Sequence, residues 1–83
     1  MYLHLGSDEM LPIEEIVAIL NIEAPISESV KEIIELASIE KTLKPICKKE
    51  RAKSLVITSS SVYLSPISSI TLFKRSNSDY REA

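Results

Sequence analysis

The sequence predicts a small α+β fold, with a mostly antiparallel sheet, one longer helix and a short C-terminal helix. Residues 55–57 and 62–64 are short apolar runs separated by a serine-rich break, a pattern typical of a β-hairpin. Residues 28–41 carry apolar side chains at the three- and four-residue spacing of an amphipathic helix. The pair Ser65–Pro66 predicts the start of a second helix, because serine caps the first amides and proline presets φ at the first helical position.

The N-terminal segment predicts two strands around a tight turn. Residues 2–5 alternate in the manner of a strand, and Gly6 can adopt the positive φ that such a turn requires. Met10 and Leu11 are expected to return as a second strand. Pro12 restricts that strand to a sheet edge or a bend, because proline lacks an amide donor.

A strand and the longest helix are predicted next. Residues 16–22 are rich in β-branched side chains and end before Pro25, which favours a buried strand. Ser27 is a candidate N-cap for the helix at residues 28–41, and Pro45 is expected to stop it, because the residue before a proline avoids helical geometry. The stripe expected to face the core comprises Val30, Ile33, Ile34 and Ala37.

The stretch between this helix and the hairpin mixes apolar and charged residues. Ile46 and Cys47 are predicted to begin a short strand, and residues 48–53 form a charged turn that leads into the hairpin. Residues 55–57 are apolar in succession, so this strand is expected to be covered on both faces.

The C-terminal helix is predicted to begin at Ser65–Pro66 and to contribute Ile67, Ile70 and Phe73 to the core. The polar residues 76–83 lack periodicity and are expected to form a flexible tail. A single domain is therefore expected over residues 1–75.

Composition indicates an assembling protein of a reducing compartment. An isolated chain of 83 residues buries only about 60% of its unfolded surface, yet 45% of these residues are hydrophobic, so an oligomer interface is expected. Cys47 is the only cysteine, which excludes an intrachain disulfide. No apolar run reaches the roughly 18 residues that cross a bilayer, and the N-terminus lacks the pattern of a signal peptide. We expect a cytoplasmic protein with no membrane partner.

The sequence offers no pattern for catalysis, for a metal or for a cofactor. His4 is the only histidine, whereas a zinc site needs about four ligands. The serines lack the surroundings of a nucleophile, and Glu14–Glu15 are interpreted as solvated carboxylates. Cys47 is interpreted as a small buried hydrophobe, and a single glycine excludes a phosphate-cradling loop. We expect neither an enzyme nor a cofactor.

The net charge of −2 conceals an asymmetry between the two halves of the chain. Residues 1–40 carry nine Asp and Glu against one Lys, a balance of −8, whereas residues 41–83 carry nine Lys and Arg against three Asp and Glu, a balance of +6. This division suggests a face that binds polyanions or head-to-tail contact between copies. A second interpretation of the basic residues is a solvated loop. The candidate nucleic-acid-binding residues are the clustered cations Lys48, Lys49, Arg51 and Lys53.

Several segments together resemble one known family, the small bacterial extracellular-matrix regulators of the RemA/RemB type, and in particular its RemB or YaaB-like branch. The similarity is carried by the opening MYLHLG, the segment IVAIL and above all the run VYLSPISSITLFKR. It extends from Met1 to about Arg75. The resemblance implies a compact α+β subunit that assembles into rings. Proteins of the RemA branch regulate the transcription of biofilm-matrix genes and bind DNA through arginines, so the resemblance implies such a role here.

The resemblance transfers only in part to individual residues. Arg51 lies where RemA-type proteins hold one arginine of a basic pair, and Lys53 keeps a further positive charge. Glu50 replaces the other arginine, and Glu15 falls where RemA-type proteins carry a DNA-contacting arginine. Carboxylates repel phosphate, and a pI of about 5.4 is low for a DNA-binding domain. Ring assembly and a regulatory role are therefore expected to transfer more completely than the DNA contact.

Two hypotheses follow. The first is a ring-forming regulator of the matrix type, in which oligomerisation multiplies a weak DNA site at the basic cluster. The alternative is an oligomeric interaction module that does not bind DNA and that pairs with itself or with a paralogue.

Overall fold

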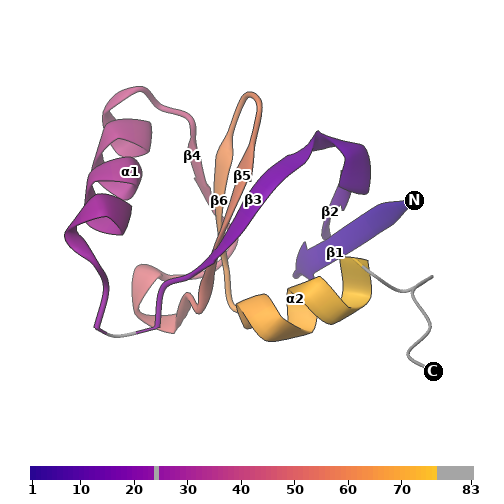
Figure 1. Cartoon of the computed structure of the whole chain (residues 1–83). Helices are drawn as coiled ribbons and strands as arrows, with labels where there is room; N and C mark the ends of the chain where they lie inside the picture. The colour runs from indigo at the N-terminus through magenta and orange to yellow at the C-terminus, as the bar shows by residue number, and fades with distance from the viewer. Residues whose placement is uncertain (24, 77–83) are drawn as a thin grey trace.

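The protein forms three layers, and the computed structural model describes residues 1–23 and 25–76. A four-stranded sheet forms the middle layer in the order β3-β5-β6-β4. Helix α1 covers one face, and the β1–β2 hairpin with helix α2 covers the other (Figure 1). The elements are β1 (Tyr2–Gly6), β2 (Glu9–Pro12), β3 (Ile16–Asn21), α1 (Glu28–Ile39), β4 (Leu43–Pro45), β5 (Ser54–Thr58), β6 (Val62–Ser65) and α2 (Ser69–Ser76), with 3-10 turns η1 (Ile13–Glu15) and η2 (Lys49–Arg51).

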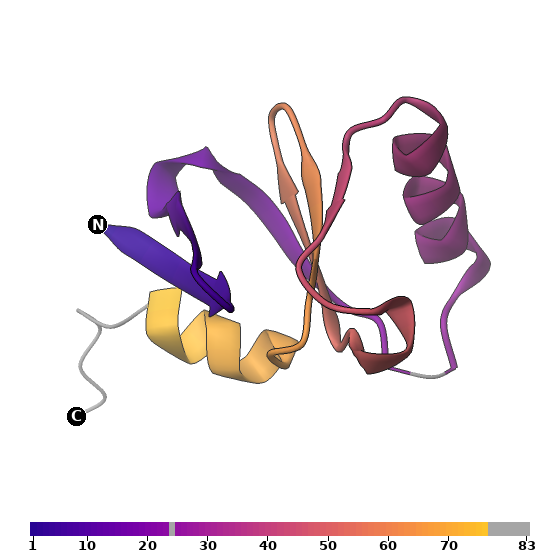
Figure 2. The ribbon, with the colours of Figure 1, turned by 180° about the vertical axis from the view of Figure 1, so that it is seen from behind.

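The predicted α+β class is confirmed, with mostly antiparallel strands, one longer helix and a shorter C-terminal helix. Strands β3, β5 and β6 pair antiparallel in succession, and β4 is parallel to β6. The described strands form two sheets, because β1 and β2 pair only with each other. Seen from behind, α1 and α2 lie on opposite sides of the β5–β6 hairpin (Figure 2).

Each face of the central sheet has its own hydrophobic core. This arrangement explains the consecutive apolar residues of β5, since Leu55 faces one core and Val56 faces the other. The predicted double coverage of this strand is thereby confirmed, because both side chains are fully buried. The core under α2 comprises Leu3, Leu5, Leu11, Val56, Tyr63 and Leu72, and the core under α1 comprises Ile22, Ile34, Ala37, Leu55, Val62 and Leu64.

The predicted hairpin is confirmed, and its turn is organised by Thr58. The Thr58 hydroxyl accepts hydrogen bonds from the amides of Ser60 and Ser61 at 3.3 and 2.9 Å, and it donates to the Ser61 carbonyl at 3.0 Å. A side chain that bonds nearby backbone groups in this way stabilises a turn without glycine.

The start of α1 is confirmed, and the predicted cause of its termination is wrong. The Ser27 hydroxyl caps the helix by accepting from the Val30 amide at 3.2 Å. The helix ends at Ile39, two residues before the predicted Lys41, and it is stopped by the left-handed φ of 62° at Lys41 rather than by Pro45. The amides of Lys41 and Thr42 then bond the carbonyls of Ser38 and Ala37, which is a Schellman termination.

The early end of α1 leaves room for β4, which is displaced from the strand predicted at Ile46 and Cys47. Strand β4 spans Leu43–Pro45, and the Ile46 amide makes the last bond to β6 at Leu64. Pro45 is compatible with this strand because β4 lies at the edge of the sheet, where a missing amide donor is tolerated.

Helix α2 starts later than predicted and buries a different face. Ser65 ends β6, where its hydroxyl donates to the Leu5 carbonyl at 2.6 Å and accepts from the Ile67 amide at 3.1 Å. The cap is Ser68, whose hydroxyl accepts from the Thr71 amide. Within the helix Ser69 and Leu72 are buried, whereas Ile70 and Phe73 are exposed. Helix α2 includes Ser76, and residues 77–83 of the predicted tail lie outside the described part of the chain.

Strand β3 is confirmed in extent, but the prediction that it is buried is wrong. It pairs with β5 on one side only, and Val17 is 69% exposed. The strand is therefore an apolar edge of the sheet rather than a central strand.

Candidate functional site

The four predicted binding cations lie around η2, between the end of β4 and the start of β5. Lys48 precedes the turn, Lys49 and Arg51 belong to it, and Lys53 adjoins β5. The turn is closed by a hydrogen bond of 2.8 Å from the Arg51 amide to the Lys48 carbonyl. All four side chains are exposed, so the turn presents positive charge to solvent.

These cations are not neutralised by neighbouring carboxylates. Within residues 1–23 and 25–76, the ion pairs join the N-terminus to Glu14 and Lys31 to Glu28, so none involves the η2 cluster. Glu50 lies in the same turn and reduces its net charge. An exposed cation without an internal partner is available to an external anion.

Three of the four cations line one shallow groove of about 600 Å³, which we call the η2 groove. Lys49, Arg51 and Lys53 contribute its positive charge, while Lys48 does not line it. Sequence reasoning missed Glu23, which follows β3 and brings a carboxylate to the same groove. The remaining lining is Ile22, Ile26, Glu50, Ala52 and Pro66.

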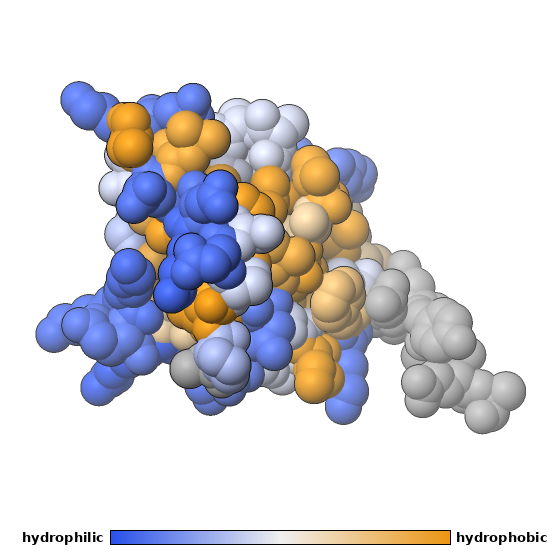
Figure 3. All heavy atoms as spheres, turned by 60° about the vertical axis from the view of Figure 1, so that its left-hand side comes forward, coloured by the Kyte–Doolittle hydropathy of each residue, from blue (hydrophilic) through white to orange (hydrophobic). Residues whose placement is uncertain are grey.

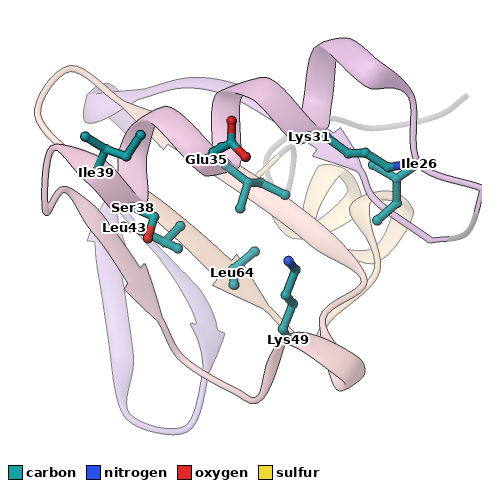
Figure 4. A pocket seen from close by; sticks show the side chains of 9 residues that line it. Ile26, Lys31, Glu35, Ser38, Ile39, Leu43, Lys49 and Leu64 are labelled. Carbon is teal, nitrogen blue, oxygen red and sulfur yellow. The ribbon is translucent and has the colours of Figure 1, made fainter.

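A second groove of about 510 Å³ continues from the first beneath α1 (Figure 4). The two grooves share Ile26 and Lys49, and Figure 4 shows Lys49 pointing from η2 towards the space under the helix. Lys31, the one lysine of the acidic half of the chain, lines this groove and was not singled out from the sequence. Its helical spacing to Ile34, Glu35 and Ser38 is the signal that could have identified it.

Glu15, the departure expected to repel DNA, lies far from the η2 cluster. It precedes β3, whereas the η2 end of the sheet lies beside the far end of that strand, where Asn21 pairs with Ser54. A six-residue strand is roughly 20 Å long at about 3.3 Å per residue. The carboxylates that lie near the cations are therefore Glu23 and Glu50, not Glu15.

The structure also locates the other residues considered for chemistry. His4 Nε2 lies 2.6 Å from the Ser7 carbonyl oxygen in the β1–β2 turn. Cys47 is half-buried rather than buried; desolvation raises the pKa of its thiol, and the Arg51 guanidinium opposes that shift. In residues 1–23 and 25–76 no three His, Cys, Asp or Glu side chains converge as metal ligands, and no helix is long and apolar enough to cross a membrane.

Comparison with known proteins gives two concordant matches. One relative, extracellular matrix regulatory protein B of Bacillus subtilis (strain 168), is 36% identical over 75 residues, which cover 90% of this chain and 89% of that protein. Residues 2–75 match the RemA-like family, described as extracellular matrix regulatory protein A-like. The match includes both sheets, both helices and the η2 cluster, and the chain therefore belongs to the RemA-like family of extracellular matrix regulatory proteins.

Proposed function

We propose that this chain is a non-enzymatic, cytoplasmic regulator of extracellular-matrix or biofilm genes. It self-associates, as a ring, and contacts double-stranded DNA through Lys48, Lys49, Arg51 and Lys53. The observation that supports this proposal most directly is the η2 turn, whose cations are exposed and make no ion pair within the described residues. Family membership supports the regulatory part, since the relative from Bacillus subtilis is named for that role.

Self-association is needed because one copy offers a weak site. About two to four phosphate contacts per subunit give a modest affinity, which falls as the salt concentration rises. Each contact adds about 0.9 to the slope of the logarithm of the binding constant against the logarithm of the salt concentration. The carboxylates of Glu23 and Glu50 reduce the affinity of one copy further. Several copies held together act at a high effective concentration, so the combined affinity exceeds that of one copy by orders of magnitude.

The test is a binding titration with a labelled DNA duplex at 50 mM and at 200 mM salt. We expect binding at low salt that weakens steeply at the higher concentration. Arg51→Glu should weaken binding by about tenfold or more, because it removes one phosphate contact and adds a repulsive charge at every copy. Lys74→Glu makes the same charge change on the exposed surface of α2 and should have a smaller effect.

Two results would contradict this function. Absence of binding at 50 mM salt by protein shown to be oligomeric would remove DNA as the ligand. Equal binding by Arg51→Glu and wild-type protein would remove the assigned site while leaving DNA binding in place.

The alternative is an interaction module that pairs with itself or with a paralogue and does not bind DNA. The outer face of α1 supports it, because Leu36 and Ile39 are exposed there beside acidic residues. Figure 3 turns this side of the molecule forward and shows orange hydrophobic residues among blue hydrophilic ones. An oligomer that fails to bind DNA at low salt would favour this function.

A further inference from the structure

The central sheet has one open edge, at β3. Strand β3 pairs with β5 alone among the described strands. The Ile22 amide bonds the Lys53 carbonyl at 3.1 Å, and antiparallel strands alternate in the direction of their hydrogen bonds. By this alternation the backbone groups of Ile19 and Asn21 point away from β5. They are available to a further strand.

This edge lacks most of the features that prevent strand pairing in natural proteins. Residues 16–22 contain no charged residue, no proline and no glycine. The one irregularity is a shift of register between Ile16 and Ala18, after which pairing with β5 is regular. Val17 and Phe73 are 69% and 48% exposed, and both line an apolar groove of about 220 Å³ where α2 adjoins β3.

The opposite edge of the same sheet differs in charge. Strand β4 lies there, preceded by Lys41 and containing Lys44, and both side chains are exposed. Thr42 and Ile46 bond β6, so the backbone groups of Leu43 and Pro45 face outward. Because proline lacks an amide, the Leu43 amide and the two carbonyls are the groups of β4 that a further strand can bond. Lys44 lines a groove with Asp8 and Glu9, which partly balance its charge, so Lys41 is the principal cation at the start of this edge. Strand β3 is preceded by Glu15, which is exposed and makes no ion pair within the described residues.

The strand directions allow the two edges to meet. Strand β5 is antiparallel to both β3 and β6, and β4 is parallel to β6, so β3 and β4 run in the same direction. Two copies placed side by side in one orientation would therefore align β3 of one copy parallel to β4 of the next. Parallel strands start at the same end, which brings Glu15 of one copy near Lys41 of the other.

We propose that β3 of one copy pairs in parallel with β4 of a second copy, so that the sheet continues from subunit to subunit. This inference rests on the self-association proposed above and specifies its interface. A symmetric β3–β3 pairing centred on Ile19 would place Glu15 opposite Glu23, which like-charge repulsion disfavours. The head-to-tail contact uses different surfaces of the two copies and therefore forms a ring or a filament.

The first test introduces a charge at the open edge. We expect Val17→Lys to weaken assembly at least tenfold, measured as the concentration at which native mass spectrometry detects half of the chains as the 9.3 kDa monomer. Ile70→Lys is the matched control, since Ile70 is an equally exposed apolar residue on α2, at 67%, and should leave assembly unchanged. Circular dichroism of both variants establishes that each one is folded.

The second test exchanges the charges. Glu15→Lys and Lys41→Glu should each weaken assembly, and the double variant should restore it, because every interface again pairs opposite charges. Failure of restoration in a folded double variant would overturn the parallel β3–β4 contact.

The outcomes separate this inference from the proposed function. A wild-type protein that is monomeric at micromolar concentration would contradict self-association itself. A wild-type oligomer that Val17→Lys and Ile70→Lys leave equally intact would contradict only the β3 interface.

Discussion

The two faces of the central sheet are covered to different degrees. Beneath α2, the side chains of Leu5 and Leu72 are completely buried. Beneath α1, Ile34 retains 7% exposure, and a groove of about 510 Å³ separates the helix from η2. Helix α2 contributes a fully buried side chain to its core, whereas the face under α1 keeps an open groove that Lys31 and Lys49 line.

Contacts that join the N-terminal strand β1 to β6 and to α2 add to the difference in burial between the two faces. The Ser65 hydroxyl bonds the Leu5 carbonyl, 60 residues away, and Arg75 donates to the His4 carbonyl at 3.3 Å. Gly6 has a φ of 118°, and a Cβ there would lie 3.0 Å from Pro66, so β1 and the end of β6 approach as closely as glycine allows. Among the described residues, the side-chain hydrogen bonds of α1 are all local, and none involves a side chain of η2.

The largest predicted effect is the loss of stability when a core side chain is truncated, and it should differ between the two cores. Leu72→Ala removes a fully buried side chain and should lower the free energy of unfolding by about 4 kcal/mol. Ile34→Ala should cost only about 2 kcal/mol, because the adjoining groove lets the site relax. Urea unfolding of both variants measures the difference, and equal losses would remove the distinction between the two faces.

A smaller effect is expected from two serines that cap or connect elements. Ser65→Ala should cost about 2 kcal/mol, since it leaves the buried Leu5 carbonyl without its hydroxyl donor. Ser27→Ala removes only the exposed N-cap of α1 and should cost about 1 kcal/mol. Thermal unfolding ranks the two, and a larger loss for Ser27→Ala would reverse the assignment of the stabilising face.

The smallest effect concerns the thiol beside η2. Burial raises the pKa of Cys47 and Arg51 opposes that shift, so the thiolate is less abundant than that of an exposed cysteine at the same pH. Arg51→Ala should therefore raise the pKa further and slow alkylation by iodoacetamide, whereas Lys53→Ala should change the rate less. A faster reaction in Arg51→Ala would show that access to the thiol, rather than charge, controls its rate.

The same contrast explains how much the sequence could predict. Local signals were sufficient for the β5–β6 hairpin, for the Ser27 cap and for the extent of β3. They failed where distant segments decide the structure. Ser65 carries the local pattern of a helix cap, yet its hydroxyl bonds β1, and α2 starts at Ser69 instead. Packing against β1 and β3 decides that Leu72 is buried and that Phe73 is exposed.

The candidate site was also predictable only where its residues are neighbours in the sequence. A run of four cations in six positions is visible in the sequence, so the η2 cluster could be identified directly. The contributions of Glu23 and Lys31 arise only when the end of β3 and the helix α1 fold beside η2. No local pattern reports the open edge of β3, because neighbouring strands determine which strand is central.

One measurement tests the central claim that assembled copies bind DNA: native mass spectrometry at micromolar protein, with and without a DNA duplex. We predict masses that are multiples of 9.3 kDa without DNA, and the same multiples increased by the mass of the duplex when DNA is present. A single species of 9.3 kDa under both conditions would contradict the account.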